Sequence, residues 1–133
     1  MQAILKGIYG LYSASSTLKA ALPCGLHREM APQCMNGTDA WATYFVVSGR
    51  PEYWFANRYY EVINIQFDIY ALTHALRMTA YGALTGVYDN AKPTVTGYRS
   101  IIMERDFQQL LRDGDMDQYY RAIVTYDCRF LKT

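Results

Sequence analysis

The sequence predicts an α+β fold in which an antiparallel sheet of about four strands carries two helices on one face. Two observations support this fold class. Residues 61–72, EVINIQFDIYAL, alternate between apolar and polar side chains, which is the period of a half-buried strand. Residues 2–22 instead repeat apolar side chains every three or four positions, which is the period of an amphipathic helix. A sheet and helices of this kind bury their apolar surfaces against each other.

The first predicted helix covers residues 2–22. Its buried stripe passes through Ser15. The helix ends before Pro23 and Gly25, because proline cannot continue a helix and glycine tolerates the turn. A short strand over Leu26–Met30 is predicted to follow. The apolar residues of the helical stripe are Ile4, Ile8, Leu11, Leu18 and Leu22.

Two strands and a second helix are predicted in the middle of the chain. Trp41–Ser48 is rich in aromatic and β-branched residues and is predicted to form a strand, which Gly49-Arg50-Pro51 breaks. Tyr59–Ala71 is the alternating strand, and it is expected to run antiparallel to its predecessor because the connection is short. From Leu72 the apolar period changes to about four, which indicates a helix closed by Tyr88-Asp89-Asn90.

Two further strands, Val95–Glu104 and Tyr119–Leu131, complete the predicted sheet. The period of two predicts which side chains share a face. The face toward the helices carries Ile63, Ile65, Phe67, Ile69, Tyr120, Ala122, Val124, Tyr126, Cys128 and Phe130. The opposite face carries the polar residues Asn64, Gln66, Asp68, Arg121, Thr125, Asp127 and Arg129, interrupted by Tyr70, Tyr119 and Ile123.

Length and composition limit what the chain can be. With 133 residues, 51% hydrophobic and 19% charged, it is expected to fold as one domain over residues 1–133. The net charge of +1 argues against a dedicated nucleic-acid binder, which needs a strong basic excess. No apolar run approaches a membrane span and no signal peptide is evident, so a soluble protein without membrane contact is expected. The 13 tyrosines favour protein interfaces.

The residues that could carry metal or catalytic chemistry do not form a recognisable site. His27 and His74 lack the spacing of a metal motif. Cys24, His27 and Cys34 supply at most three ligands, whereas a structural zinc site needs four. The three cysteines, an odd number without a CxxC pair, favour buried thiols in a reducing compartment, with a Cys24–Cys34 bridge as the alternative. We therefore expect no metal and no cofactor.

The segment RDGDMDQ resembles the start of a calcium loop through Asp113, Asp115 and Asp117. Gln118 and Val124 stand where that loop requires glycine and glutamate, so a solvated turn is the better interpretation. Phosphate-binding glycine loops and a nucleophile elbow do not occur in the sequence. No base, nucleophile and orienting group come together, and we expect no catalysis.

The segment PEYWFANRYY, residues 51–60, joins two predicted strands with five aromatic residues and an arginine. It either extends the hairpin with alternate rings on the core or projects toward a partner. In the second case Tyr53, Trp54, Phe55 and Arg58 would anchor that partner, because tyrosine, tryptophan and arginine dominate interface hot spots.

The predicted elements follow a recognisable order. A leading amphipathic helix and a short segment ending in Ala31-Pro32 precede the strand ATYFVVSG. A strand of the EVINIQFDIYA type then runs into a helix, and a final pair of strands ends in RAIVTYDCRFL. This order resembles the tail terminator or tail completion (head–tail joining) proteins of tailed bacteriophages. The resemblance spans nearly the whole chain and rests on element order rather than on an invariant motif.

The resemblance implies a structural virion protein without catalytic residues. Such a protein forms a homo-oligomeric ring, typically of six subunits, that caps the tail tube and meets the head connector. The implied partners are further copies, the tail tube protein and the head connector protein. The implied location is the virion neck, at the head-proximal end of the tail, after assembly in the host cytoplasm. The candidate interface residues are Tyr53, Trp54, Phe55, Arg58, Asn64, Gln66 and Asp68.

Two alternatives remain open from the sequence. One is a small ligand-binding or enzymatic α+β cone-fold domain, with a pocket over a curved sheet into which Asp68, Tyr70, Asp127 or Arg129 would point. An apolar cavity with convergent polar groups would favour it, and a flat or convex polar sheet would oppose it. The other is a generic adaptor of another virion or secretion assembly, which would share the ring but not the position.

Overall fold

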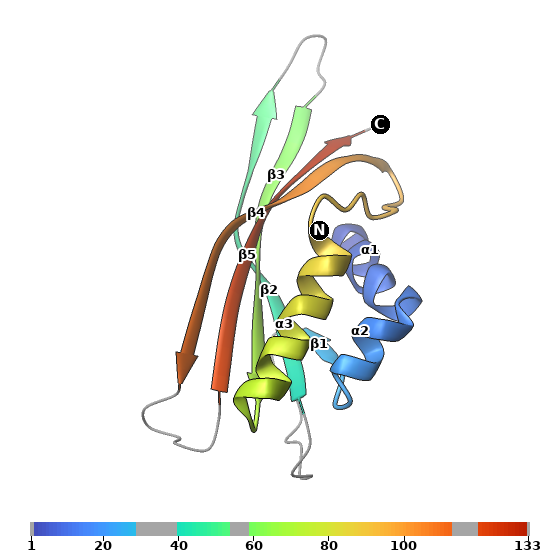
Figure 1. The fold of residues 1–133 in the computed structure, drawn as a ribbon. Coiled ribbons are helices and arrows are strands. Elements are labelled where there is room, and N and C mark those ends of the chain that lie inside the picture. The colour runs from blue at the N-terminus through green and yellow to red at the C-terminus, as the bar shows by residue number, and fades with distance from the viewer. Residues whose placement is uncertain (1, 29–39, 54–58, 113–119, 133) are drawn as a thin grey trace.

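The computed structural model describes residues 2–28, 40–53, 59–112 and 120–132. Within these residues, three helices lie on one side of a five-stranded sheet (Figure 1), which gives an α+β fold. In chain order the elements are α1 (Gln2–Ala14), α2 (Ser16–Ala21), β1 (Leu26–Arg28), β2 (Ala40–Tyr53), β3 (Tyr59–Ala71), α3 (His74–Tyr88), β4 (Tyr98–Arg112) and β5 (Tyr120–Lys132).

The sheet is mixed rather than purely antiparallel. Its strands lie in the order β1-β2-β3-β5-β4. The predicted antiparallel sheet of about four strands corresponds to β2, β3, β5 and β4, which pair antiparallel. The short strand β1 adds a fifth member that runs parallel to β2, with Leu26 opposite Ala42. Residues 29–39 separate β1 from β2, and a connection longer than a tight hairpin permits the parallel pairing.

The predicted single helix over residues 2–22 is in fact two helices. Ser15 has an extended backbone (φ −102°, ψ 109°), and its Oγ accepts a hydrogen bond from the Leu18 amide at 3.2 Å. Serine is a favoured N-cap, so a new helix starts after it. The apolar stripe continues across the break, and its buried members are Ile4, Ile8, Leu18 and Leu22.

The helix α3 agrees with its prediction. Thr73 is the N-cap, and its Oγ1 accepts a hydrogen bond from the Leu76 amide at 3.1 Å. The helix ends at Tyr88, two residues before Asn90, whose φ of 59° leaves the right-handed helical region. None of the helices in the described ranges is long and apolar enough to cross a lipid bilayer.

The hydrophobic core lies between the helices and the sheet, and Phe67 is central to it. Its side chain is fully buried, and its ring centroid lies 4.6 Å from that of Tyr88 and 5.8 Å from that of Tyr126. The predicted inward face of the two central strands is confirmed. Its buried members are Ile63, Ile65, Phe67, Ile69, Ala122, Val124, Tyr126, Cys128 and Phe130.

The strand β2 does not end at Gly49-Arg50-Pro51, contrary to the prediction. It continues to Tyr53, which pairs with Tyr59 of β3. Because β1 pairs only with residues 42–44, Pro51 lies in a part of β2 that is an edge of the sheet. Proline is tolerated at an edge, where its missing amide donor removes no ladder hydrogen bond.

The strand β4 differs most from its prediction, which was Val95–Glu104. The strand begins after Gly97, whose φ of 83° marks a turn. It then continues to Arg112 and pairs with β5 through two register shifts, at Ser100/Ile102 and Arg105/Phe107. Each shift moves the inward-facing positions by one residue, which hides the alternation in the sequence.

Candidate protein interface on the open sheet face

The helices leave one face of the sheet uncovered, and we call it the open face. Asn64, Gln66 and Asp68 lie on it at alternate positions of β3, as the alternation predicted. Gln66 Nε2 donates a hydrogen bond to Asp68 Oδ1 at 2.7 Å. Asn64 Nδ2 donates to Oδ1 of Asp127 on β5 at 2.9 Å. Three of the candidate interface residues therefore form part of one polar network across two strands.

Asp68 is the most buried member of this network, with 5% of its surface exposed. Its Oδ2 pairs with the Arg121 guanidinium at 2.8 Å. That guanidinium also lies over the Tyr70 ring, 5.5 Å from its centroid, and Tyr70 stacks on Trp41 at 5.6 Å. A buried carboxylate is stable only when its oxygens are paired, and here both are. In this part of the open face, both carboxylate oxygens of Asp68 are paired within the chain.

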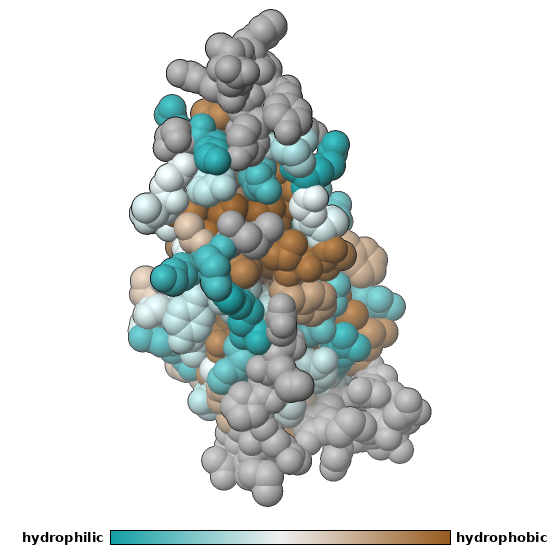
Figure 2. Space-filling view, turned by 180° about the vertical axis from the view of Figure 1, so that it is seen from behind, coloured by the Kyte–Doolittle hydropathy of each residue, from teal (hydrophilic) through white to brown (hydrophobic). Residues whose placement is uncertain are grey.

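Apolar side chains cover more of the open face than the sequence predicted. In the strand register, Phe45, Gln66, Thr125 and Phe107 form one row across the sheet. Phe107 is 49% exposed, whereas Thr125 beside it is buried. Seen from behind (Figure 2), hydrophobic residues gather at mid-height with hydrophilic residues around them. Such a mixture of aromatic and polar groups is typical of protein interfaces.

A small polar hollow lies on the open face. Its volume is about 180 Å³, whereas small-molecule sites typically measure about 300–1,000 Å³. The ligand-binding alternative needs Asp68, Tyr70, Asp127 or Arg129 around a pocket. Asp127 and Arg129 do line the hollow, but Asp68 and Tyr70 are engaged in the network described above. The lining residues are Ser48, Gly49, Arg50, Val62, Asn64, Asp127 and Arg129.

The second group of candidate residues lies at the β2–β3 hairpin. Tyr53 is the last residue of β2. Trp54, Phe55 and Arg58 fall outside the described residues. The prediction that this hairpin anchors a partner therefore stays a prediction.

The histidines hold local structure. His27 Nε2 forms a hydrogen bond with the Cys24 carbonyl at 2.6 Å. His74 Nδ1 lies 2.6 Å from a nitrogen of Arg77, whose other terminal nitrogen donates to the Leu111 carbonyl at 2.9 Å. These contacts tie the His27 ring to the turn before β1 and the His74 ring to its own helix. Among the described residues, His, Cys, Asp and Glu do not gather in a group of three that could hold a metal ion.

The cysteines differ from the expectation of free thiols. Cys24 is disulfide-bonded, in line with the bridge that the sequence left as an alternative, and Cys34 lies outside the described residues. Cys128 is a free thiol in the core. Burial raises its pKa to about 12, so it stays protonated and weakly reactive at neutral pH.

Comparison with known proteins gives one match of note. No protein-family model and no curated protein matches the sequence. Among solved structures, the chain is similar in fold to a chain in the virion of a native gene transfer agent (GTA) particle. The sequences are 12% identical, and the match covers 93% of this chain and 91% of that chain with a TM-score of 0.73. At this identity the match shows a shared fold.

The alternation of β5 predicts that Arg121 lies on the polar face, but it does not reveal that Arg121 is the partner of Asp68. The signal was present, because an acid and a base stand on the same face of two predicted strands. Only the pairing of β3 with β5, which sets Asp68 opposite Ile123 and next to Arg121, shows that they meet. Phe107 was missed because the predicted strand ended at Glu104.

Proposed function

We propose that the chain is a non-enzymatic structural protein of a phage-like virion. The observation that carries this proposal is the fold match, which spans nearly the whole of both chains and pairs this chain with a virion component. The open face supports it as well. The carboxylate oxygens of its buried Asp68 are already paired within the chain, and its exposed Phe107 suits packing against another protein.

Within the virion, the proposed position is the head-proximal end of the tail, where a ring of copies caps the tail tube and joins it to the head connector. The resemblance of the element order to tail terminator and tail completion proteins supports this position and a ring of about six copies. A closed ring needs two different patches on each subunit. We assign one to the open face around Asn64, Gln66 and Asp68, and a contact with the tail tube to the β2–β3 hairpin.

Removal of the gene during particle assembly tests the proposal. We expect filled heads, with tails that are unjoined or overlong in electron micrographs, because the tail lacks its cap and its joint. Supplying the intact chain from a second copy of the gene should restore joined particles, which controls for effects on neighbouring genes. Infectious particles of normal tail length in the absence of the chain would refute the assignment.

A further inference from the structure

The outer surface of the helical layer, formed by α1, α2 and α3, is unusual for surface helices. These three helices of the described chain contain neither Asp nor Glu, and their charged side chains are Lys6, Lys19 and Arg77. Lys6 and Lys19 are exposed, whereas Arg77 is buried. Surface helices normally present charges of both signs to water. This layer is therefore basic where it is charged, and elsewhere it is largely small and neutral.

Three glycines of this layer have no explanation within the described chain. Gly10, Gly82 and Gly86 are exposed within helices, and an added Cβ at any of them would meet no atom within 4 Å. Gly7 differs, because a Cβ there would lie 2.7 Å from the Thr94 carbonyl oxygen. Glycine weakens a helix relative to alanine, so a reason for keeping it is expected. Close approach of another molecule is such a reason.

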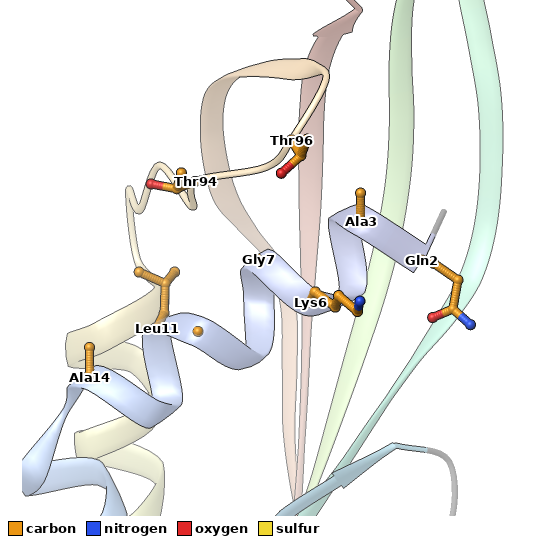
Figure 3. Close-up of a pocket in the computed structure, with 9 residues that line it drawn as sticks. Gln2, Ala3, Lys6, Gly7, Leu11, Ala14, Thr94 and Thr96 are labelled. Atoms are coloured by element: carbon orange, nitrogen blue, oxygen red, sulfur yellow. The ribbon is translucent and has the colours of Figure 1, made fainter.

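Gly10 and Gly82 each line a groove in the helical layer, whereas Gly86 lines neither of the two. Figure 3 shows the first groove, which has a volume of about 720 Å³ and runs along α1 beneath Thr94 and Thr96. The second lies between α2 and α3 and has a volume of about 810 Å³; we call it the α2–α3 groove. Met78 at its side is 38% exposed. Its lining residues are Ser16, Thr17, Ala20, Ala21, Met78, Thr79, Gly82 and Ala83.

The opposite edge of the molecule has a complementary feature. All residues from Glu104 to Leu110 of β4 are exposed, although Arg105 reaches the helical side and pairs with Asp89 at 3.0 Å. The reason is the arrangement of the layers, since α3 packs on β3 and β5, while β4 lies beyond them at the sheet edge. We call this segment the β4 arm. It carries the acids Glu104 and Asp106 beside Phe107 and Leu110, which are 49% and 43% exposed.

We propose that the β4 arm of one copy docks in the α2–α3 groove of the next copy. The inference rests on the proposed ring. The arm extends the patch assigned to the open face, which Phe107 shares with Gln66, and the groove is the patch that meets it. The groove is lined by uncharged residues, but the exposed Lys19 of α2 directly precedes the lining residue Ala20. The start of the arm carries two acids, so unlike charges meet in this contact. Phe107 and Leu110 supply bulk, and the alanines and Gly82 of the groove leave room for it. The two patches differ, as a closed ring requires.

Pairing of backbone edges is a weaker way to join the same copies. The outer edge of β4 is interrupted by two register shifts, and the exposed edge of β2 contains Pro51 and a further shift between Val46 and Ser48. Bulges and edge prolines are the features by which strands avoid pairing with other chains. Side chains of the arm, rather than its backbone edge, are therefore the groups that make the contact.

A site-specific cross-link tests the contact directly. Phe107 is replaced by the photo-cross-linker p-benzoyl-phenylalanine, and the full chain is irradiated both as concentrated purified protein and in assembled particles. We expect a cross-linked dimer in which residue 107 of one copy is joined to α2 or α3 of another. Adding Gly82→Gln fills the groove and should lower the dimer yield about tenfold or more, since even 1.4 kcal/mol of lost contact has that effect. Gly10→Gln, the same change in the other groove, is the matched control and should leave the yield unchanged.

Reversing the charges of the two surfaces gives a second test. Variants that merely misfold would not recover when they are mixed. One variant carries Glu104→Lys and Asp106→Lys, so its arm and its helical layer are both basic. The other carries Lys19→Glu, so its arm and its helix α2 are both acidic. Each variant alone should give fewer cross-links than the unmodified chain, whereas an equal mixture should restore them, because each arm then meets a layer of opposite charge.

The outcomes separate this inference from the proposed function. Cross-links that map to other elements, equal loss with Gly10→Gln and Gly82→Gln, or no recovery in the mixture would overturn the arm-in-groove contact. The virion role would then still stand on the particle morphology. Normal particles in the absence of the chain, together with the expected cross-link, would instead remove the virion role and keep the contact as a self-association.

Discussion

Removing the Arg121 guanidinium should destabilise the fold markedly, because it would leave a buried carboxylate with only part of its partners. Asp68 is 5% exposed, and its two oxygens are engaged by Gln66 at 2.7 Å and Arg121 at 2.8 Å. Breaking a fully buried ion pair by removing one partner costs about 3–5 kcal/mol. The Arg121 side chain is 29% exposed, so water partly replaces it. We therefore expect Arg121→Met to lower the free energy of unfolding by about 2–3 kcal/mol.

Urea unfolding at neutral pH measures this change as a lower midpoint at constant slope. Arg129→Met is the matched control, since Arg129 lies on the open face of the same strand but is exposed. It should change the free energy of unfolding by no more than about 0.5 kcal/mol. Adding Asp68→Asn to Arg121→Met should recover part of the loss, because a neutral amide is less costly to bury than a carboxylate. Equal midpoints for Arg121→Met and Arg129→Met would refute the reasoning.

Two further predictions concern the core. Phe67→Ala should lower the free energy of unfolding by about 3–5 kcal/mol, because the ring is fully buried between Tyr88 and Tyr126. A loss below about 1 kcal/mol, measured by urea unfolding, would contradict this packing. Burial raises the pKa of both tyrosines far above their ordinary value of 10.0. Above pH 10 their protons therefore stay bound in the folded state but leave in the unfolded state. The free energy of unfolding is at its full value below pH 10 and falls above it, by about 1.4 kcal/mol per pH unit for each phenol. Tyr126→Phe should make the fall less steep, and an unfolding free energy that is constant from about pH 9 to pH 11 would contradict this.

Local patterns in the sequence predicted the central part of the fold well. Strand β5 was predicted over Tyr119–Leu131 and spans Tyr120–Lys132, because six inward positions follow the period of two without interruption. The break at Ser15 was missed because the apolar stripe continues through it. The strand β2 passes through Pro51 because no strand lies outside it there, and the position of a strand in a sheet is a tertiary property.

The candidate site was predictable in part. The alternation in β3 placed Asn64, Gln66 and Asp68 on one face, as the structure has them. It did not show that Asp68 is buried, because that depends on Arg121, which lies 53 residues away in the chain. The exposed Phe107 was hidden by the register shift at Arg105/Phe107, which breaks the pattern on which the prediction depended.

The polar residues of the open face and the surfaces proposed for docking have different physical roles. Asp68 and Arg121 neutralise each other within the chain, so they offer little net charge to a partner. An ion pair of this kind contributes less to the affinity for a docking partner than to specificity. A wrongly placed partner would cover the pair without offering it polar contacts, and such a contact is unfavourable. The β4 arm and the α2–α3 groove instead combine apolar contact with unlike charges, which provides both affinity and steering. A polar strand face flanked by such surfaces therefore suits a subunit that stays folded alone and joins its neighbours only in one orientation.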